Sequence, residues 1–190
     1  MVKEFKRMTS ALESKTPIPL KDIEPVLGEL GAVHRETVVN VADLAQALGD
    51  CIESATLALD PTEYHLLKIV PRRRDAATIS IYLYHFSPSG QDSYIGLAAG
   101  ERAYINLPDD VYPPIDAPPA KLLLSAVRAI VDGRLVETIH FRGDRPYKDA
   151  FDLPTQLGPI ASEHLRLSSW LRKCFSKHSE QVRTYVPYAA

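Results

Sequence analysis

The chain has 190 residues, of which 45% are hydrophobic and 24% are charged, and its formal net charge is -2. This length favours a single domain over residues 1–190 that buries a hydrophobic core without disulfides or structural metals. The small net charge argues against a nucleic-acid-binding protein, because neutralising phosphates requires a surplus of basic residues.

Cysteine usage and hydropathy indicate a cytoplasmic protein. The only two cysteines, Cys51 and Cys174, form no CxxC pair, and we expect both to be buried thiols in helices. No apolar run approaches the roughly 20 residues of a membrane span. The N-terminal residues lead into no apolar stretch typical of a signal peptide.

The first elements are predicted to be helical. Apolar residues three to four apart predict an amphipathic helix over residues 2–14, and a helical turn is expected over 23–30. Residues 1–36 then form an N-terminal helical extension. Asn40 is an expected N-cap, and the apolar spacing after it predicts a helix over 41–58.

Short strands separated by turns follow. We expect strands over residues 64–70, 77–86, 93–98 and 102–107, and this spacing is typical of an antiparallel meander. Residues 108–119 contain five prolines and three aspartates. This composition predicts a stiff surface loop within the same domain.

The last part of the chain adds further helices and strands. We expect a helix over 120–131 capped by Gly133 in the left-handed conformation, then a hairpin over 135–142 and 147–153. A helix over 160–175 is expected to bury Leu165, Leu167, Trp170, Leu171, Cys174 and Phe175. The tail over 181–186 is an expected edge strand. The fold class is therefore α+β, with helices packed on a single antiparallel sheet made of the meander and the hairpin.

Tyrosines are expected to gather on one face of this sheet. Side chains alternate between the two faces of a strand, so aliphatic residues of the meander share one face and tyrosines the other. The tyrosines in question are Tyr82, Tyr84, Tyr94 and Tyr104. One interpretation is that a helix of the same chain covers them or that they are scattered, half-exposed residues. The other is a surface that binds a partner, since tyrosine is enriched at interfaces.

Two charged segments are further candidates for partner contact. The run Arg72, Arg73 and Arg74 is the most basic part of the chain and follows a predicted strand. Asp109 and Asp110 lie in the proline-rich loop. Both segments are also typical of ordinary solvated loops.

Motifs for chemistry are missing. No HxH or HExxH pair, GxSxG turn or glycine-rich phosphate loop occurs, so we expect no metal and no cofactor. An enzyme whose site lacks a local motif stays an alternative: His85 and His140 lie on predicted strands and could form a hydrolase-like site with Glu137.

Two resemblances point toward binding. The order of elements from about residue 41 resembles that of type III secretion chaperones, which are small non-enzymatic dimers that hold effectors. Residues 126–143, AVRAIVDGRLVETIHFRG, are similar to a helix–glycine–strand unit of small bacterial immunity proteins, which block a cognate toxin. Both resemblances imply stoichiometric binding of another protein.

The sequence therefore favours a non-enzymatic protein-binding module of immunity, inhibitor or chaperone type. Its expected partner is a protein such as a toxin or an effector, without nucleic acid or membrane. The chain itself is expected to be a monomer or a homodimer.

Overall fold

The computed structural model describes residues 16–60, 62–85, 94–101, 103–107, 115–142, 145–165 and 178–189. The expected helix over residues 2–14 lies outside these ranges, as do Trp170 and Cys174.

Antiparallel strands form two sheets with helices packed on them, so the α+β prediction is confirmed. The six-stranded sheet has the order β1 (Ile18–Pro19), β2 (Ile52–Ala58), β3 (Tyr64–Pro71), β4 (Ile79–Tyr84), β5 (Ile95–Ala99) and β6 (Ala103–Leu107). The four-stranded sheet has the order β10 (His178–Thr184), β7 (Val136–Arg142), β8 (Arg145–Thr155) and β9 (Gly158–Leu165). The expectation of a single sheet is wrong, because the meander and the C-terminal strands pair only among themselves.

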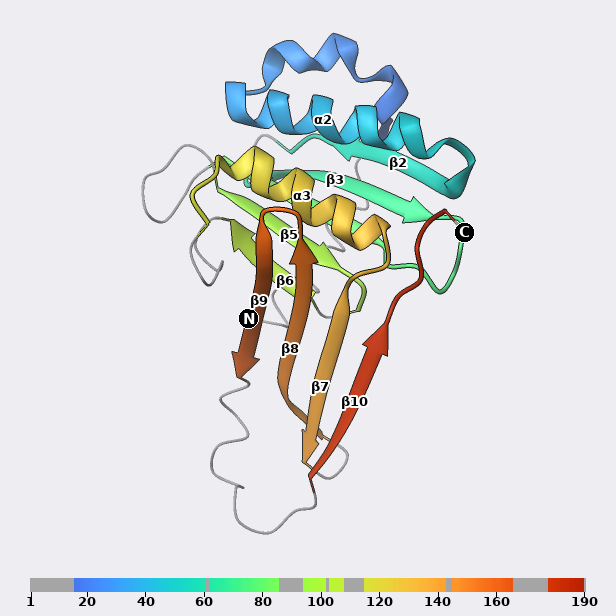
Figure 1. Cartoon of the computed structure of the whole chain (residues 1–190). Helices are drawn as coiled ribbons and strands as arrows, with labels where there is room; N and C mark the ends of the chain where they lie inside the picture. The colour runs from blue at the N-terminus through green and yellow to red at the C-terminus, as the bar shows by residue number, and fades with distance from the viewer. Residues whose placement is uncertain are drawn as a thin grey trace.

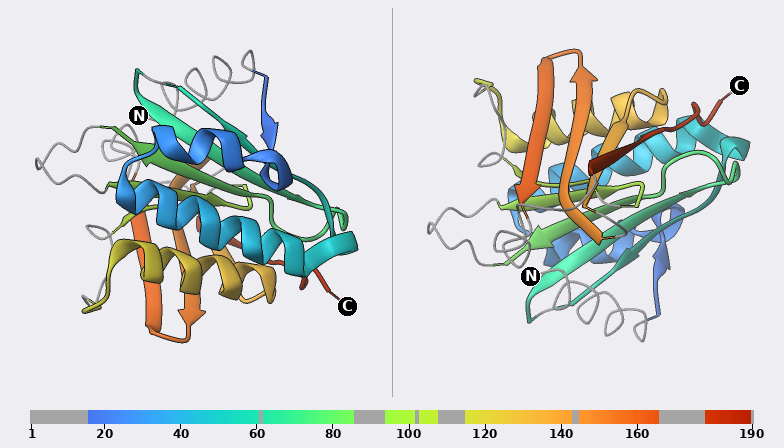
Figure 2. Two further views of the ribbon diagram at one scale, coloured as in Figure 1. Left: turned by 90° about the horizontal axis from the view of Figure 1, so that it is seen from above. Right: turned by 90° about the horizontal axis from the view of Figure 1, so that it is seen from below.

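Two α-helices lie side by side on one face of the six-stranded sheet (Figures 1 and 2): α2 (Ala32–Leu48) and α3 (Pro119–Val131). Short 3-10 turns precede and follow α2: η1 (Leu20–Asp22), η2 (Glu24–Glu29) and η3 (Gly49–Cys51). The four-stranded sheet extends away from α3, as Figure 1 shows. Neither α2 nor α3 has the length and hydropathy of a membrane span, and the rest of the described chain contains no such helix.

The helix expected over residues 41–58 is wrong at both ends. The helix α2 begins earlier, at Ala32, and Asn40 lies inside it instead of capping it. Gly49 ends the helix with a φ of 48°, a conformation that glycine adopts without strain. Residues 52–58 pair with β3, because their apolar spacing also suits a half-buried strand. Cys51 is therefore half-buried in η3 and not in a helix core.

The helix expected over 160–175 is also wrong where the structure describes it. Residues 158–165 form β9, which pairs antiparallel with β8 through a turn whose Gly158 has a φ of 135°. As in residues 52–58, pairing with a neighbouring strand outweighs an apolar spacing that also fits a helix. By contrast, the four meander strands, α3 and the edge strand near the C-terminus are found close to their predicted bounds.

The end of α3 confirms the predicted glycine cap. Gly133 has a φ of 73°, its amide donates to Ile130 and the amide of Arg134 donates to Ala129. These two bonds are those of a Schellman motif, which satisfies the last carbonyls of a helix. The chain can therefore turn directly from α3 into β7.

A single hydrophobic core joins the helices to both sheets. Its members come from the inner faces of α2 and α3, from alternate residues of β3–β6, and from β8 and β9. Ile79, Ile81 and Leu83 of β4 are fully buried in it, as their alternation predicts. Tyr188 near the C-terminus also enters this core, where its hydroxyl donates to the Ala77 carbonyl.

Candidate functional site

The outer face of the six-stranded sheet carries a compact group of five tyrosines, which we call the tyrosine face: Tyr64, Tyr82, Tyr84, Tyr94 and Tyr104. The ring centroids of Tyr84 and Tyr94 are 5.3 Å apart, and those of Tyr82 and Tyr104 are 6.2 Å apart. Rings at these separations are in direct contact. The predicted gathering of the four meander tyrosines is therefore present in the fold.

Register explains why the rings meet. Tyr64 lies opposite Tyr84 in the β3–β4 pair, and Tyr82 lies opposite Gly96 in the β4–β5 pair. A Cβ atom at Gly96 would lie 2.8 Å from the Tyr104 hydroxyl and 3.1 Å from the Tyr84 ring. The missing side chain at this position therefore lets Tyr84 and Tyr104 approach each other.

The tyrosine face is graded in exposure. Tyr64 and Tyr82 are buried, with exposed fractions of 0% and 3%, whereas Tyr84, Tyr94 and Tyr104 are half-buried. Neither α2 nor α3 covers these rings, since both helices pack on the opposite, aliphatic face. The two buried rings, Tyr64 and Tyr82, are thus in contact with rings that reach solvent.

Hydrogen bonds fix two of the half-buried rings. The hydroxyls of Tyr84 and Tyr104 are 3.0 Å apart, and the Tyr104 hydroxyl donates to the Asn106 side chain at 2.7 Å. In contrast, the buried hydroxyl of Tyr64 has no hydrogen-bond partner among the residues that the structure describes. On the tyrosine face, the hydroxyls of Tyr84 and Tyr104 are thus hydrogen-bonded, whereas the buried hydroxyl of Tyr64 has no partner among the described residues.

Burial keeps these tyrosines neutral. Desolvation raises the pKa of Tyr64 to about 12, with smaller contributions from Tyr84 and Glu63. Desolvation likewise raises the pKa values of Tyr82, Tyr84 and Tyr104. The hydroxyls therefore act as hydrogen-bond donors and acceptors and carry no charge near neutral pH.

The arginine run lies between β3 and β4. Arg73 pairs with Asp75 at 3.3 Å, and this hydrogen bond lowers the pKa of the Asp75 carboxyl. Arg72 approaches Asp50 at 3.9 Å, and Arg74 is exposed. Part of the positive charge is thus neutralised within the chain. The other charged candidates, Asp109 and Asp110, lie outside the described residues.

Three histidines meet at one end of the aliphatic face. The ring centroids of His65 and His85 are 4.3 Å apart, and His34 of α2 lies 6.3 Å from each. The Asp60 amide donates to Nδ1 of His65, and Nε2 of His85 contacts the Asp60 carbonyl. Within the described ranges, no three histidine, cysteine or carboxylate side chains are arranged to hold a metal ion.

His34 is the unusual member of this histidine cluster. Its side chain is buried and its Nε2 atom finds no hydrogen-bond partner among the described residues. Desolvation, followed by the charge of His85, lowers the pKa of His34. His34 therefore resists protonation.

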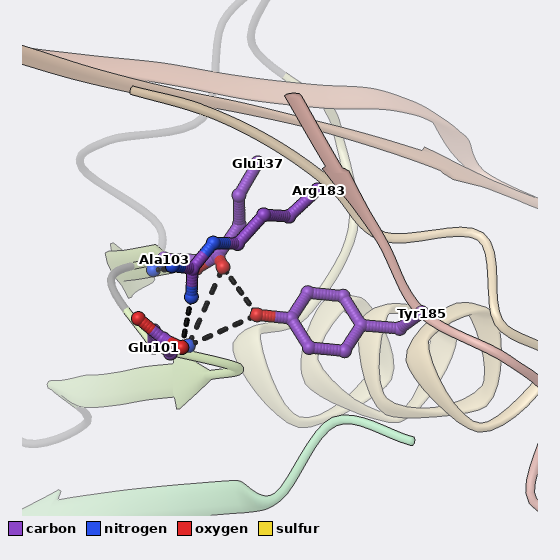
Figure 3. A network of polar contacts seen from close by, with 5 residues as sticks. All are labelled: Glu101, Ala103, Glu137, Arg183 and Tyr185. Atoms are coloured by element: carbon purple, nitrogen blue, oxygen red, sulfur yellow. Dashed lines mark hydrogen bonds and ion pairs between the residues drawn. The ribbon is translucent and has the colours of Figure 1, made fainter. Parts of the chain in front are cut away.

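Glu137 takes part in a different arrangement from the predicted hydrolase-like site (Figure 3). Its buried carboxylate accepts hydrogen bonds from the amide of Ala103 at 2.6 Å, from the amide of Glu101 at 3.4 Å and from the Tyr185 hydroxyl. Arg183 forms an ion pair with Glu101. These contacts join β7 and the segment after β10 to the β5–β6 turn, so Glu137 fastens the two sheets together.

The structure does not bring His85 and His140 together. His85 follows β4 in the six-stranded sheet, whereas His140 lies on β7 in the other sheet, 3.6 Å from Glu180. Glu137 and His140 are three residues apart on a regular stretch of strand and so face opposite sides. The three residues of the predicted site therefore have three separate environments.

Two internal spaces lined by described residues are too small for a small molecule. One space between β6, α3 and β8 measures about 10 Å³, and a second beside Glu137 is no larger. Such volumes hold at most one water molecule.

Sequence patterns missed Tyr64 and the histidine cluster. Tyr64 begins a predicted strand, and only the β3–β4 register shows that it lies opposite Tyr84. His65 and His85 alternate in step with the core residues of their strands, so the sequence alone could have placed both on the aliphatic face. His34 carries no such signal, because α2 was expected to begin after it.

Comparisons with protein-family models, with curated proteins and with solved structures find no match. The resemblances to immunity proteins and to type III secretion chaperones therefore stay predictions.

Proposed function

We propose that the protein is a non-enzymatic binding module that holds one partner protein through its tyrosine face. The observation that carries the proposal is the packing of three half-buried tyrosines on two buried ones. Tyrosine combines a large apolar ring with a polar tip and often contributes about 2 kcal/mol or more to binding when it is central to an interface.

The arrangement suits binding because the rings are already held in place. Tyr84 and Tyr104 share a hydrogen bond, and each also contacts another ring of the tyrosine face. Ordering flexible side chains costs about 0.5–1.5 kcal/mol each on association. Rings that are fixed before the partner arrives avoid most of this cost.

The proposal includes an activity of immunity, inhibitor or chaperone type, which a binding surface of this kind would suit. Such proteins act by occupying a partner and need no reacting group of their own. The enzyme alternative has no comparable support, since His85, His140 and Glu137 face different surroundings.

Affinity capture in the native host tests the proposal. Three tagged forms are compared by quantitative mass spectrometry: the natural chain, the double variant Tyr84→Ala/Tyr104→Ala, and Val39→Ala as a control. Val39 is 37% exposed on α2, away from the tyrosine face. We expect one protein in a 1:1 ratio with the natural chain and with the control, and its loss from the double variant.

Two results would contradict the proposal. One is capture of the same protein at equal yield by all three forms, which would place the contact elsewhere. The other is a natural chain that retains no protein in stoichiometric amount. Circular dichroism of the double variant checks that the loss is not caused by unfolding.

A further inference from the structure

The two sheets have four edges, and three of these carry at least one feature that hinders pairing with another strand. The edge strand β1 has only two residues and includes Pro19. At the edge strand β6, the first amide, that of Ala103, donates to the Glu137 carboxylate. The edge strand β9 begins with Gly158 and Pro159, and proline has no amide to donate. Short strands, occupied amides and prolines are the usual means of blocking an exposed edge.

The fourth edge, β10, lacks these features. It pairs with β7 along all seven residues without a bulge, and it contains no proline. Among the strands that the structure describes, β7 is its only neighbour, and Figure 1 shows β10 at the outer border of the sheet. Val182, in the middle of β10, is 55% exposed and is one of two exposed large aliphatic residues on the described surface.

The charged side chains of β10 lie close to groups of their own molecule. Arg183 forms an ion pair with Glu101, and Glu180 lies 3.6 Å from His140 of β7. Charged side chains protect an edge when they project toward an approaching strand. Here Arg183 is held by its ion pair and Glu180 lies beside His140, and Val182 is the exposed apolar side chain in the middle of the strand.

We propose that β10 pairs antiparallel with β10 of a second copy of this chain, about a two-fold axis at Val182, so that the two four-stranded sheets become one. In this register the two Val182 side chains lie opposite each other. Gln181 lies opposite Arg183 of the second copy, and Glu180 lies opposite Thr184. Residues directly opposite share one face of a continuous sheet, so only registers centred on a residue are possible.

Charge favours the Val182 register over its neighbours. A register centred on Glu180 would place two carboxylates opposite each other, and one centred on Arg183 would place two guanidinium groups together. Like charges directly opposite destabilise a strand pair. A register centred on Gln181 avoids such clashes but leaves Val182 opposite Glu180.

The expected dimer is weak. Pairing two seven-residue strands buries less than the roughly 1,000 Å² of a stable interface. We therefore expect a dissociation constant on the order of 100 μM, with association visible only at high concentration. The proposal does not depend on the tyrosine face, so the two can fail separately.

Sedimentation velocity over a range of concentrations tests the proposal on the full chain. We expect the natural chain to move from monomer toward dimer as its concentration rises to about 500 μM. Val182→Lys and Val182→Glu should each weaken association roughly tenfold or more, because each places like charges opposite each other. An equimolar mixture of the two variants should associate at least as well as the natural chain.

Val39→Lys is the matched control, since it adds the same charge at the other exposed valine, and it should leave association unchanged. Melting temperatures of all variants check folding, which the exposure of Val182 is expected to preserve. A natural chain that stays monomeric up to about 500 μM would overturn the proposal without any variant. So would Val182→Lys associating like the natural chain, or a mixture no tighter than either variant alone.

Discussion

The two faces of the six-stranded sheet are built from the same strands but differ in composition and covering. One face presents aliphatic residues such as Ile81, which α2 and α3 bury completely. The other presents the tyrosine face, whose outer rings stay half-buried with neither α-helix over them. A sheet needs only one covered face to be stable, so the second is available for another task.

The largest expected difference is in stability. Ile81→Ala removes a fully buried side chain and should lower the free energy of unfolding by about 3 kcal/mol, through lost burial and the cavity left behind. Tyr84→Ala removes a half-buried ring and should cost about 1 kcal/mol. Urea unfolding of both variants measures the difference. Equal losses would mean that the tyrosine face is as much a part of the core as the aliphatic face.

A smaller contrast concerns two buried hydroxyls. The Tyr188 hydroxyl donates to the Ala77 carbonyl in the aliphatic core, whereas the Tyr64 hydroxyl on the tyrosine face has no partner among the described residues. Tyr188→Phe should lower the free energy of unfolding by about 1–2 kcal/mol, because a buried acceptor loses its donor. Tyr64→Phe should be neutral or stabilising by up to about 1 kcal/mol. A loss at Tyr64 similar to that at Tyr188 would contradict this assignment.

A third test perturbs the tyrosine face alone. Gly96→Ala places a methyl group where Tyr84 and Tyr104 meet, so one ring must move by a few tenths of an ångström. We expect a stability loss of about 1 kcal/mol or less and a clear change in the near-ultraviolet circular dichroism of the tyrosines. Gly28→Ala is the control, since nothing lies within 4 Å of the added atom. Unchanged tyrosine signals in Gly96→Ala would contradict the contact.

The smallest expected effect concerns the histidine cluster at the end of the aliphatic face. Because burial and His85 lower the pKa of His34, the unfolded chain binds a proton more readily than the folded chain. The stability from neutral His34 is complete above its unfolded pKa of about 6.5 and is lost as pH falls below that value. The melting temperature should therefore fall by a few degrees between pH 7.5 and pH 5.

Replacing His34 with phenylalanine isolates this contribution. The ring contacts with His65 and His85 are kept, while the titrating group is removed. We expect the melting temperature of His34→Phe to depend less on pH than that of the natural chain. Equal pH dependence of the two would assign the acid sensitivity to other groups.

Much of the meander could be predicted from the sequence because the alternation of side chains along a strand depends only on neighbouring residues. The alternation from Ala77 to Tyr84 separates core from tyrosines, and Gly133 marks the end of α3. The boundaries of α2 were not predicted, because apolar residues on both sides of Gly49 fit helical spacing. The strand β9 was missed for the same reason: local spacing allowed a helix, whereas pairing with β8 made a strand.

The candidate site was predicted in part for a related reason. Parity placed four tyrosines on one face, but contact between them depends on strand register, which only the folded chain supplies. The histidine cluster joins α2, β3 and β4 and so depends on long-range packing. The division into two sheets, fastened at Glu137, likewise follows from contacts between distant segments.

The most direct test of the tyrosine face is the affinity of the captured partner protein, measured by titration calorimetry. We expect one partner per chain and a loss of roughly 30-fold or more for Tyr84→Ala and for Tyr104→Ala, with the control Val39→Ala unchanged. Affinities within about twofold of the natural chain for both tyrosine variants, with their folds intact, would contradict a role of this face in binding.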